Sequence, residues 1–145
     1  MSELTLDKAQ KIVTAAIAAG RDKKLMLLAV AVLDARGALK SFSAEDGTSL
    51  KRGEIAIGKA SAALAFGLGT RSINKMAKDR PYFIDCAAQA VGGPFIPVPG
   101  GVLIKSDKGV LLGAVGISGD VSDNDEAAAI AGIQAAGFTA DGGKD

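Results

Sequence analysis

The chain has 145 residues, 48% of them hydrophobic and 23% charged, which is long and apolar enough for one folded core. Its 17 basic residues nearly balance its 16 acidic ones, so the charge gives no reason to expect nucleic acid or an anionic membrane as partner. Histidine is absent and there is one cysteine, which excludes His-dependent triads and intrachain disulfides and leaves almost no ligands for zinc.

No apolar run approaches the roughly 18 residues that a membrane-spanning helix needs. The first residues, MSELTLDKAQ, lack the basic and then apolar layout of a secretory signal. We therefore expect a cytoplasmic protein with a single domain over residues 1–145 and with no bound metal.

The first part of the chain predicts a helix, a hairpin and a second helix. A helix is expected from Thr5 to about residue 19, because Thr5 can cap it and apolar residues recur on one face. The apolar run 25–33 and residues 38–42 flank an Asp-Ala-Arg-Gly turn, a pattern typical of paired antiparallel strands. A helix over residues 52–66 follows, and a Gly-Leu-Gly segment ends it.

The second part predicts two short helices, a second hairpin and a closing helix. Thr70 is expected to cap one short helix, and Pro81 suits the first turn of the next. Two apolar runs, 102–104 and 110–117, are joined by a Ser-Asp-Lys-Gly turn and predict the second hairpin. The last helix is expected over residues 124–136.

Two hairpins among helices predict an α+β fold with a central antiparallel sheet flanked by helices. Runs 25–33 and 110–117 are apolar on both faces, so we expect them in the middle of the sheet. Residues from Ala140 onward are expected to fray. The helices are rich in alanine and can approach a sheet or another subunit closely, so we expect a homo-oligomer.

The end of the second hairpin is the first candidate site. Gly113 and Gly116 pack no side chain, so a helix of the fold or a ligand is expected close to the backbone there. The strand ends at a Ser-Gly-Asp loop, and Asp123 with Glu126 three residues later predicts a capping box. A glycine-lined strand end would then lie beside a helix N-terminus.

Lys59 is the most informative polar residue. It lies four residues from both Ile55 and Ala63, so it shares a stripe with apolar side chains on the expected helix. If that stripe faces the sheet, the ammonium group needs a partner, and Asp46, Asp125, a C-terminal carbonyl or an anionic ligand could serve. The alternative is that the stem packs and the charged end reaches water.

Other residues are weaker candidates. Asp125 lies in a first helical turn, where a carboxylate is favourable through the helix dipole alone or could handle a proton. Arg71 could bind a carboxylate, and residues 100–101, a Gly-Gly pair, could offer backbone N–H groups to an anion. Tyr82 and Cys86 are the remaining phenolic and thiol ligands, or else ordinary core residues.

Five stretches in order give the chain a resemblance to the GlcG/HbpS-like haem-degrading-domain family: LTLDKAQKIVTAAI, AVAVLDARGALKSFSAEDG, IAIGKASAALAFGLGT, PGGVLIKSDKGVLLGAVGISG and DNDEAAAIAG. The resemblance implies an antiparallel sheet flanked by helices, a homo-oligomer, and an association with haem or corrinoid binding. It also points to a set of site residues: Asp46, Lys59, Thr70, Gly100, Gly101, Gly116, Ser118, Gly119 and Asp125.

Three functions stay open at this stage. The resemblance favours a binding protein for a small molecule, with haem or another tetrapyrrole as ligand. The polar residues allow a cofactor-independent isomerase, tautomerase or hydratase for an anionic catabolite, in which Lys59 or Arg71 holds a carboxylate and Asp125 or Asp46 moves a proton. The third function is that of a non-catalytic accessory subunit.

Overall fold

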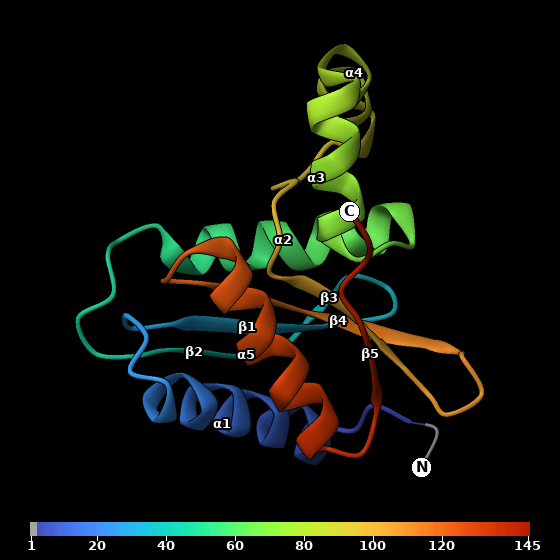
Figure 1. The fold of residues 1–145 in the computed structure, drawn as a ribbon. Helices are drawn as coiled ribbons and strands as arrows, with labels where there is room; N and C mark the ends of the chain where they lie inside the picture. The colour runs from blue at the N-terminus through green and yellow to red at the C-terminus, as the bar shows by residue number, and fades with distance from the viewer. Residues whose placement is uncertain (1–2) are drawn as a thin grey trace.

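One sheet with helices on both faces makes up the described part of the chain, residues 3–145 of a computed structural model (Figure 1). Its strands run in the order β2-β1-β4-β3-β5, and every neighbouring pair is antiparallel. The elements are α1 (Leu6–Asp22), β1 (Ala29–Asp34), β2 (Leu39–Ala44), α2 (Arg52–Phe66), α3 (Thr70–Asp79), α4 (Pro81–Val91), β3 (Gly101–Lys105), β4 (Leu111–Ser118), α5 (Ser122–Ala135) and β5 (Thr139–Asp141).

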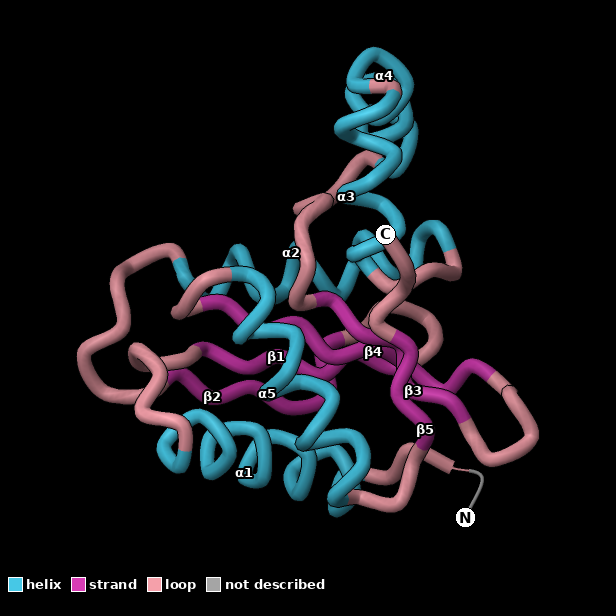
Figure 2. The backbone as a smooth tube through the Cα atoms, viewed as in Figure 1, coloured by secondary structure: helices cyan, strands magenta, loops and turns pink. Residues whose placement is uncertain are grey.

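The expected α+β class and the merging of two hairpins into one layer are confirmed. Helices α1 and α5 cover one face of the sheet, and α2 covers the other (Figures 1 and 2). Strands β1 and β4 occupy inner positions, as expected from their apolar sequences. No helix of the described residues is both long and apolar enough to cross a membrane.

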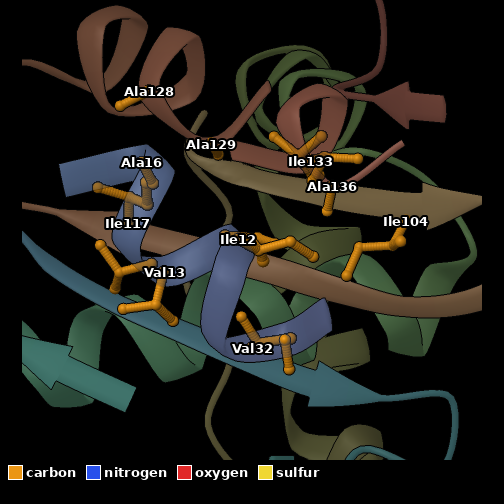
Figure 3. Packing of buried hydrophobic residues seen from close by; sticks show 14 of the residues in the cluster. Ile12, Val13, Ala16, Val32, Ile104, Ile117, Ala128, Ala129, Ile133 and Ala136 are labelled. Carbon is orange, nitrogen blue, oxygen red and sulfur yellow. The ribbon is translucent and has the colours of Figure 1, made fainter. Parts of the chain in front are cut away.

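Alternation along β1 separates large from small side chains. Val30 and Val32 point into the main core beneath α1 and α5, where they meet residues such as Ile12 and Ile133 (Figure 3). The alternate positions, Ala29 and Ala31, pack with Ala56 of α2 on the other face. Since successive strand residues face opposite sides, one strand builds a thick core on one face and a close helix contact on the other.

Several boundaries agree closely with the sequence analysis. Helix α2 spans the expected residues, and Pro81 is at the start of α4. Thr5 caps α1, since its hydroxyl accepts a hydrogen bond of 3.2 Å from the Lys8 amide. Strand β1 is shorter than its apolar run, because the Leu25 amide donates to Gly20 at the end of α1 and the strand begins only at Ala29.

Two capping predictions are wrong. Thr70 is the first residue of α3 and not its cap, which is Gly69; the Thr70 hydroxyl instead accepts a 2.8 Å hydrogen bond from the Gly101 amide. Helix α5 begins after Val121 without a side-chain cap, and the predicted partner Glu126 binds an arginine instead. In both cases a distant partner binds the polar group that local sequence assigned to a cap.

The prediction of a frayed tail is also wrong. Residues 139–141 form β5, which pairs with β3 through contacts such as Ile104 with Ala140. Asp141 also accepts a hydrogen bond of 2.8 Å from Lys105. The chain then passes over the start of α3, where the Arg71 amide donates to Gly142.

Helices α3 and α4 extend away from the sheet (Figures 1 and 2). A small cluster formed by Ala62, Ile73 and Ile84 holds them to α2. Most of α4 stays exposed, including Tyr82, whose residue is 72% exposed, and Cys86. These two residues are therefore not part of the core, in contrast to the second of the alternatives given for them.

Candidate functional site

The predicted site is centred on a buried ion pair. Lys59 Nζ lies 3.1 Å from Asp125 Oδ2 and donates a hydrogen bond of 2.8 Å to the carbonyl oxygen of Ile117. Lys59 is 2% exposed and Asp125 is 1% exposed. The alternative in which the lysine reaches water is therefore wrong, and the expected meeting of Lys59 with Asp125 is found.

Burial works against the charge on both partners. It lowers the pKa of Lys59, although the nearby Asp125 carboxylate raises it. It likewise raises the pKa of Asp125, against the effect of Lys59 and of the Asp120 amide, which donates to Asp125 Oδ1 at 2.9 Å. The pair joins α2, β4 and the start of α5, and both of its side chains are hydrogen-bonded.

The glycines around this pair serve close packing. A Cβ atom added at Gly116 would overlap the carbonyl oxygen of Ala56 in α2. One added at Gly101 would overlap the carbonyl oxygen of Lys59 and press on the Thr70 side chain. The sequence analysis expected either a helix of the fold or a ligand beside Gly116, and the structure has the helix. Helix α2 occupies the space that a ligand would need.

Two further glycines line the same region. Gly100 has a backbone φ of 122°, which favours glycine, and a Cβ there would lie 2.8 Å from Lys59 Nζ. Gly119 faces the backbone of Leu27, whose carbonyl oxygen a Cβ would overlap. The Gly-Gly segment at 100–101 is buried against α2 and the sheet.

Arg71 binds carboxylates, but they belong to its own chain. Its guanidinium lies 3.1 Å from Glu126, 2.6 Å from Asp123 and 3.1 Å from Asp145. These hydrogen bonds raise the pKa of Arg71 further above its already high value. The arginine thus ties α3 to α5 and to the C-terminal residue. Asp46 lies apart from all of this, in the exposed turn after β2.

A pocket of about 660 Å³ opens beside Arg71. Basic and acidic side chains line it in equal number, so its wall offers no excess charge to a ligand. The charged lining residues are Arg71, Lys75, Lys78, Asp79, Asp123 and Asp145.

A second pocket, of about 540 Å³, lies between α2 and the segment before β3; we call it the apolar pocket. Its lining residues are Lys51, Glu54, Ile55, Ile57, Pro94, Phe95 and Ile96. The sequence analysis missed this pocket, because residues 94–96 lie outside any regular element and no local pattern shows which helix they contact. Within residues 3–145, no three Cys, Asp or Glu side chains converge as metal ligands.

The family described as haem-degrading protein HbpS-like matches residues 4–134. The chain belongs to this family. A crystal structure of HbpS is 27% identical to this HbpS-like chain, with a TM-score of 0.79 and coverage of 92% of this chain and 90% of that one. No protein with a curated description matches significantly.

Two other solved structures share the fold of this HbpS-like chain at lower identity. The PduOC:heme complex is 23% identical with a TM-score of 0.83, covering 94% of this chain and 96% of that one. The Klebsiella pneumoniae protein ORFY is 21% identical with a TM-score of 0.81, covering 94% and 92%. The match of the family model to residues 4–134 confirms the family resemblance found from the sequence.

Proposed function

We propose that this HbpS-like protein binds a tetrapyrrole of the haem type, and that the apolar pocket receives the macrocycle. Family membership supports the ligand class, as does the likeness to PduOC, which was crystallised as a haem complex. The observation that carries the location is the apolar lining of a pocket whose 540 Å³ falls within the roughly 300–1,000 Å³ typical of ligand sites.

The rim of the apolar pocket suits the carboxylates of such a ligand. Lys51 lies there, with Nζ 2.9 Å from Glu54 Oε1. Both side chains are well exposed, at 64% and 70%, so the pair contributes little and Lys51 can exchange it for a ligand carboxylate. Ile55 and Phe95 offer flat or branched apolar surface behind this rim.

The lining of the apolar pocket offers contacts for the macrocycle but no usual ligand for the iron. Histidine, cysteine, methionine and tyrosine are the usual axial ligands of haem iron, and none of them lines this pocket. Tyr82 and Cys86 lie on exposed α4, outside its lining. We therefore propose binding through contacts with the ring and its carboxylates, and we assign no chemistry to the iron.

A titration with haem and with metal-free protoporphyrin IX tests this proposal. We expect both to quench intrinsic tyrosine fluorescence with similar affinity, because the ring makes the contacts. Ile55→Asp should weaken both by about tenfold or more, since it places a charge in the apolar lining. Leu39→Asp, at an exposed position of β2, is the matched control and should bind as the unsubstituted protein does.

Two results would contradict the proposal. Haem that binds far more tightly than protoporphyrin would mean that a side chain ligates the iron, which the apolar pocket does not allow. Equal weakening by Ile55→Asp and Leu39→Asp, or no binding of either ring, would remove the pocket from consideration.

No observation favours the isomerase, tautomerase or hydratase alternative. It needs Lys59 or Arg71 to hold a carboxylate and Asp125 or Asp46 to move a proton. Lys59 and Asp125 are both buried and paired with each other, and Asp46 lies apart in the exposed turn after β2. Arg71 is held by three carboxylates of the same chain. The accessory-subunit alternative would be favoured by failure of the binding experiment.

A further inference from the structure

We infer that a second pocket, separate from the apolar pocket, binds a small aliphatic carboxylate. It has a volume of about 300 Å³ and lies at the end of the sheet where β1 begins and β4 ends. Three connections meet there, at the left of Figure 1: the one before β1, the one between β2 and α2, and the one after β4. We call it the Arg52 pocket. It shares no lining residue with the apolar pocket, so this inference does not rest on tetrapyrrole binding.

The guanidinium of Arg52 is the group that would hold the carboxylate. Arg52 is partly buried, and its Nη1 donates a hydrogen bond of 3.1 Å to Ser118 Oγ. A guanidinium carries five N–H donors. Among residues 3–145, no other side chain or carbonyl accepts a hydrogen bond from Arg52, and no carboxylate lies within 4.0 Å of it. Most of its donors thus have no protein partner.

Three of the other four arginines are already neutralised, and the fourth, Arg80, lies with its guanidinium 4.7 Å from the centre of the Phe83 ring. Arg21 lies 3.0 Å from Glu45, and Arg36 lies 3.2 Å from Asp34. Arg71, the arginine that the sequence analysis selected, binds three carboxylates. Arg52 differs from these three in facing a pocket without an acidic partner.

Arg52 is the only charged side chain among the residues that line the Arg52 pocket. The nearby cation Lys59, on the same helix, is already paired with Asp125 at 3.1 Å. No acidic side chain lines the pocket. Of the acids nearby, Glu45 is paired with Arg21 and also accepts from the Leu28 amide. Asp120 accepts hydrogen bonds from backbone amides, and Asp46 lies in the exposed turn beside Gly47.

The remaining lining specifies the rest of the ligand. Thr48 and Ser49 line the same pocket as Arg52, and their hydroxyl groups can donate to a carboxylate. Met26 and Leu27 form an apolar wall, and they are 69% and 37% exposed, respectively. The pocket volume of about 300 Å³ is at the lower end of the range of roughly 300–1,000 Å³ that is typical of ligand pockets. A carboxylate on a short aliphatic chain matches a charged end, a polar edge and an apolar wall of this size.

Titration of the full chain with hexanoate, followed by ¹H–¹⁵N NMR, tests the inference. We expect saturable shifts of the Thr48, Ser49 and Gly119 amides, which line the pocket. Arg52→Gln should weaken hexanoate binding by about tenfold or more, because charge-assisted hydrogen bonds are lost. Arg52→Lys, which keeps the charge but not the fork of donors, should weaken it less.

The controls separate this site from general charge effects. Arg36→Gln removes an arginine that is 83% exposed and already paired, and it should leave hexanoate binding unchanged. Hexan-1-ol, which lacks the charge, should cause no saturable shifts at these amides. Unchanged spectra outside the pocket would show that the Arg52→Gln variant stays folded. Ser49→Ala tests the same pocket and leaves the guanidinium in place, and we expect it to weaken hexanoate binding less than Arg52→Gln does.

Three outcomes would overturn the inference. The first is hexanoate binding that Arg52→Gln and Ser49→Ala leave unaltered. The second is saturation by hexan-1-ol as readily as by hexanoate, since the guanidinium would then play no part. The third is tighter binding of inorganic phosphate than of hexanoate, which would remove the role of the apolar wall formed by Met26 and Leu27.

Discussion

Single residues in this protein depend on partners that are distant in sequence, and the Lys59–Asp125 pair is the clearest case. The two lie 66 positions apart and meet in the interior. Moving two charges out of water costs several kcal/mol each, and their attraction offsets this only when hydrogen bonds satisfy the remaining donors and acceptors. Here the Ile117 carbonyl and the Asp120 amide supply those bonds. We therefore assign the pair a structural role.

Breaking this pair should be costly. We expect Lys59→Met to lower the free energy of unfolding by about 3–5 kcal/mol at neutral pH, because Asp125 would stay buried without a cation. A second substitution, Asp125→Asn, should recover part of the loss, since the double variant no longer buries a lone charge. Urea denaturation of the single and double variants measures both quantities.

The pH dependence has a definite sign. In Lys59→Met, burial raises the pKa of Asp125 above its unfolded value of 3.8 without a lysine to oppose it. The folded state then binds a proton more tightly than the unfolded state, so its stability rises as pH falls. The stability gap between variant and unsubstituted protein should narrow from about pH 7 to about pH 5. A gap that widens, or no gap at neutral pH, would contradict this assignment.

At the scale of elements, the contact between α2 and β4 sets the geometry of the second face of the sheet. Gly116 lets the backbone of α2 approach so closely that a methyl group there would overlap the Ala56 carbonyl. Gly116→Ala should therefore lower the free energy of unfolding by about 1–3 kcal/mol through overpacking. Gly93→Ala is the matched control, because a Cβ there meets no atom within 4 Å. It should be neutral or slightly stabilising, and equal urea midpoints for both variants would refute the close approach.

Elements with a strong periodic pattern were predictable from sequence. Alternating or continuous apolar runs identified both hairpins, and Thr5 and Pro81 marked helix starts because their roles are local. Strand β5 escaped prediction because Thr139–Asp141 is short and partly polar, and its pairing with β3 is a tertiary contact. Thr70 and Glu126 were misassigned as caps for the same reason, since their partners lie 31 and 55 positions away.

The candidate site was predictable only in part. The stripe on α2 gave burial of Lys59 against the sheet as one of two alternatives, and named Asp125 as one of its possible partners; the structure has this arrangement. Sequence could not show that α2 fills the space beside Gly116, nor that Arg71 is occupied by its own chain. Arg52 was overlooked because nothing local distinguishes an unpaired arginine from a paired one.

At the scale of the whole molecule, α4 stands out because much of its apolar surface is exposed in a single copy of the chain. Its sequence, PYFIDCAAQAV, has one charged residue, yet within it only Ile84 is buried. Tyr82 and Phe83 are 72% and 38% exposed on a helix that extends away from the sheet (Figure 1). An exposed helix that is apolar on most faces lacks the polar surface of a solvated one.

We expect a second copy of this chain to cover α4, in line with the homo-oligomer expected from the sequence. Like faces of α4 can pair around a two-fold axis with little charge to repel, because Asp85 is the only ionised residue within the helix. The double variant Tyr82→Glu/Phe83→Glu adds like charges to both copies and should shift the protein to smaller species in sedimentation equilibrium. Val110→Glu, at an apolar position that is 58% exposed in the turn before β4, should leave the assembly unchanged. A protein that is monomeric without substitutions, or an assembly that resists the α4 variant, would show that this helix is not the contact.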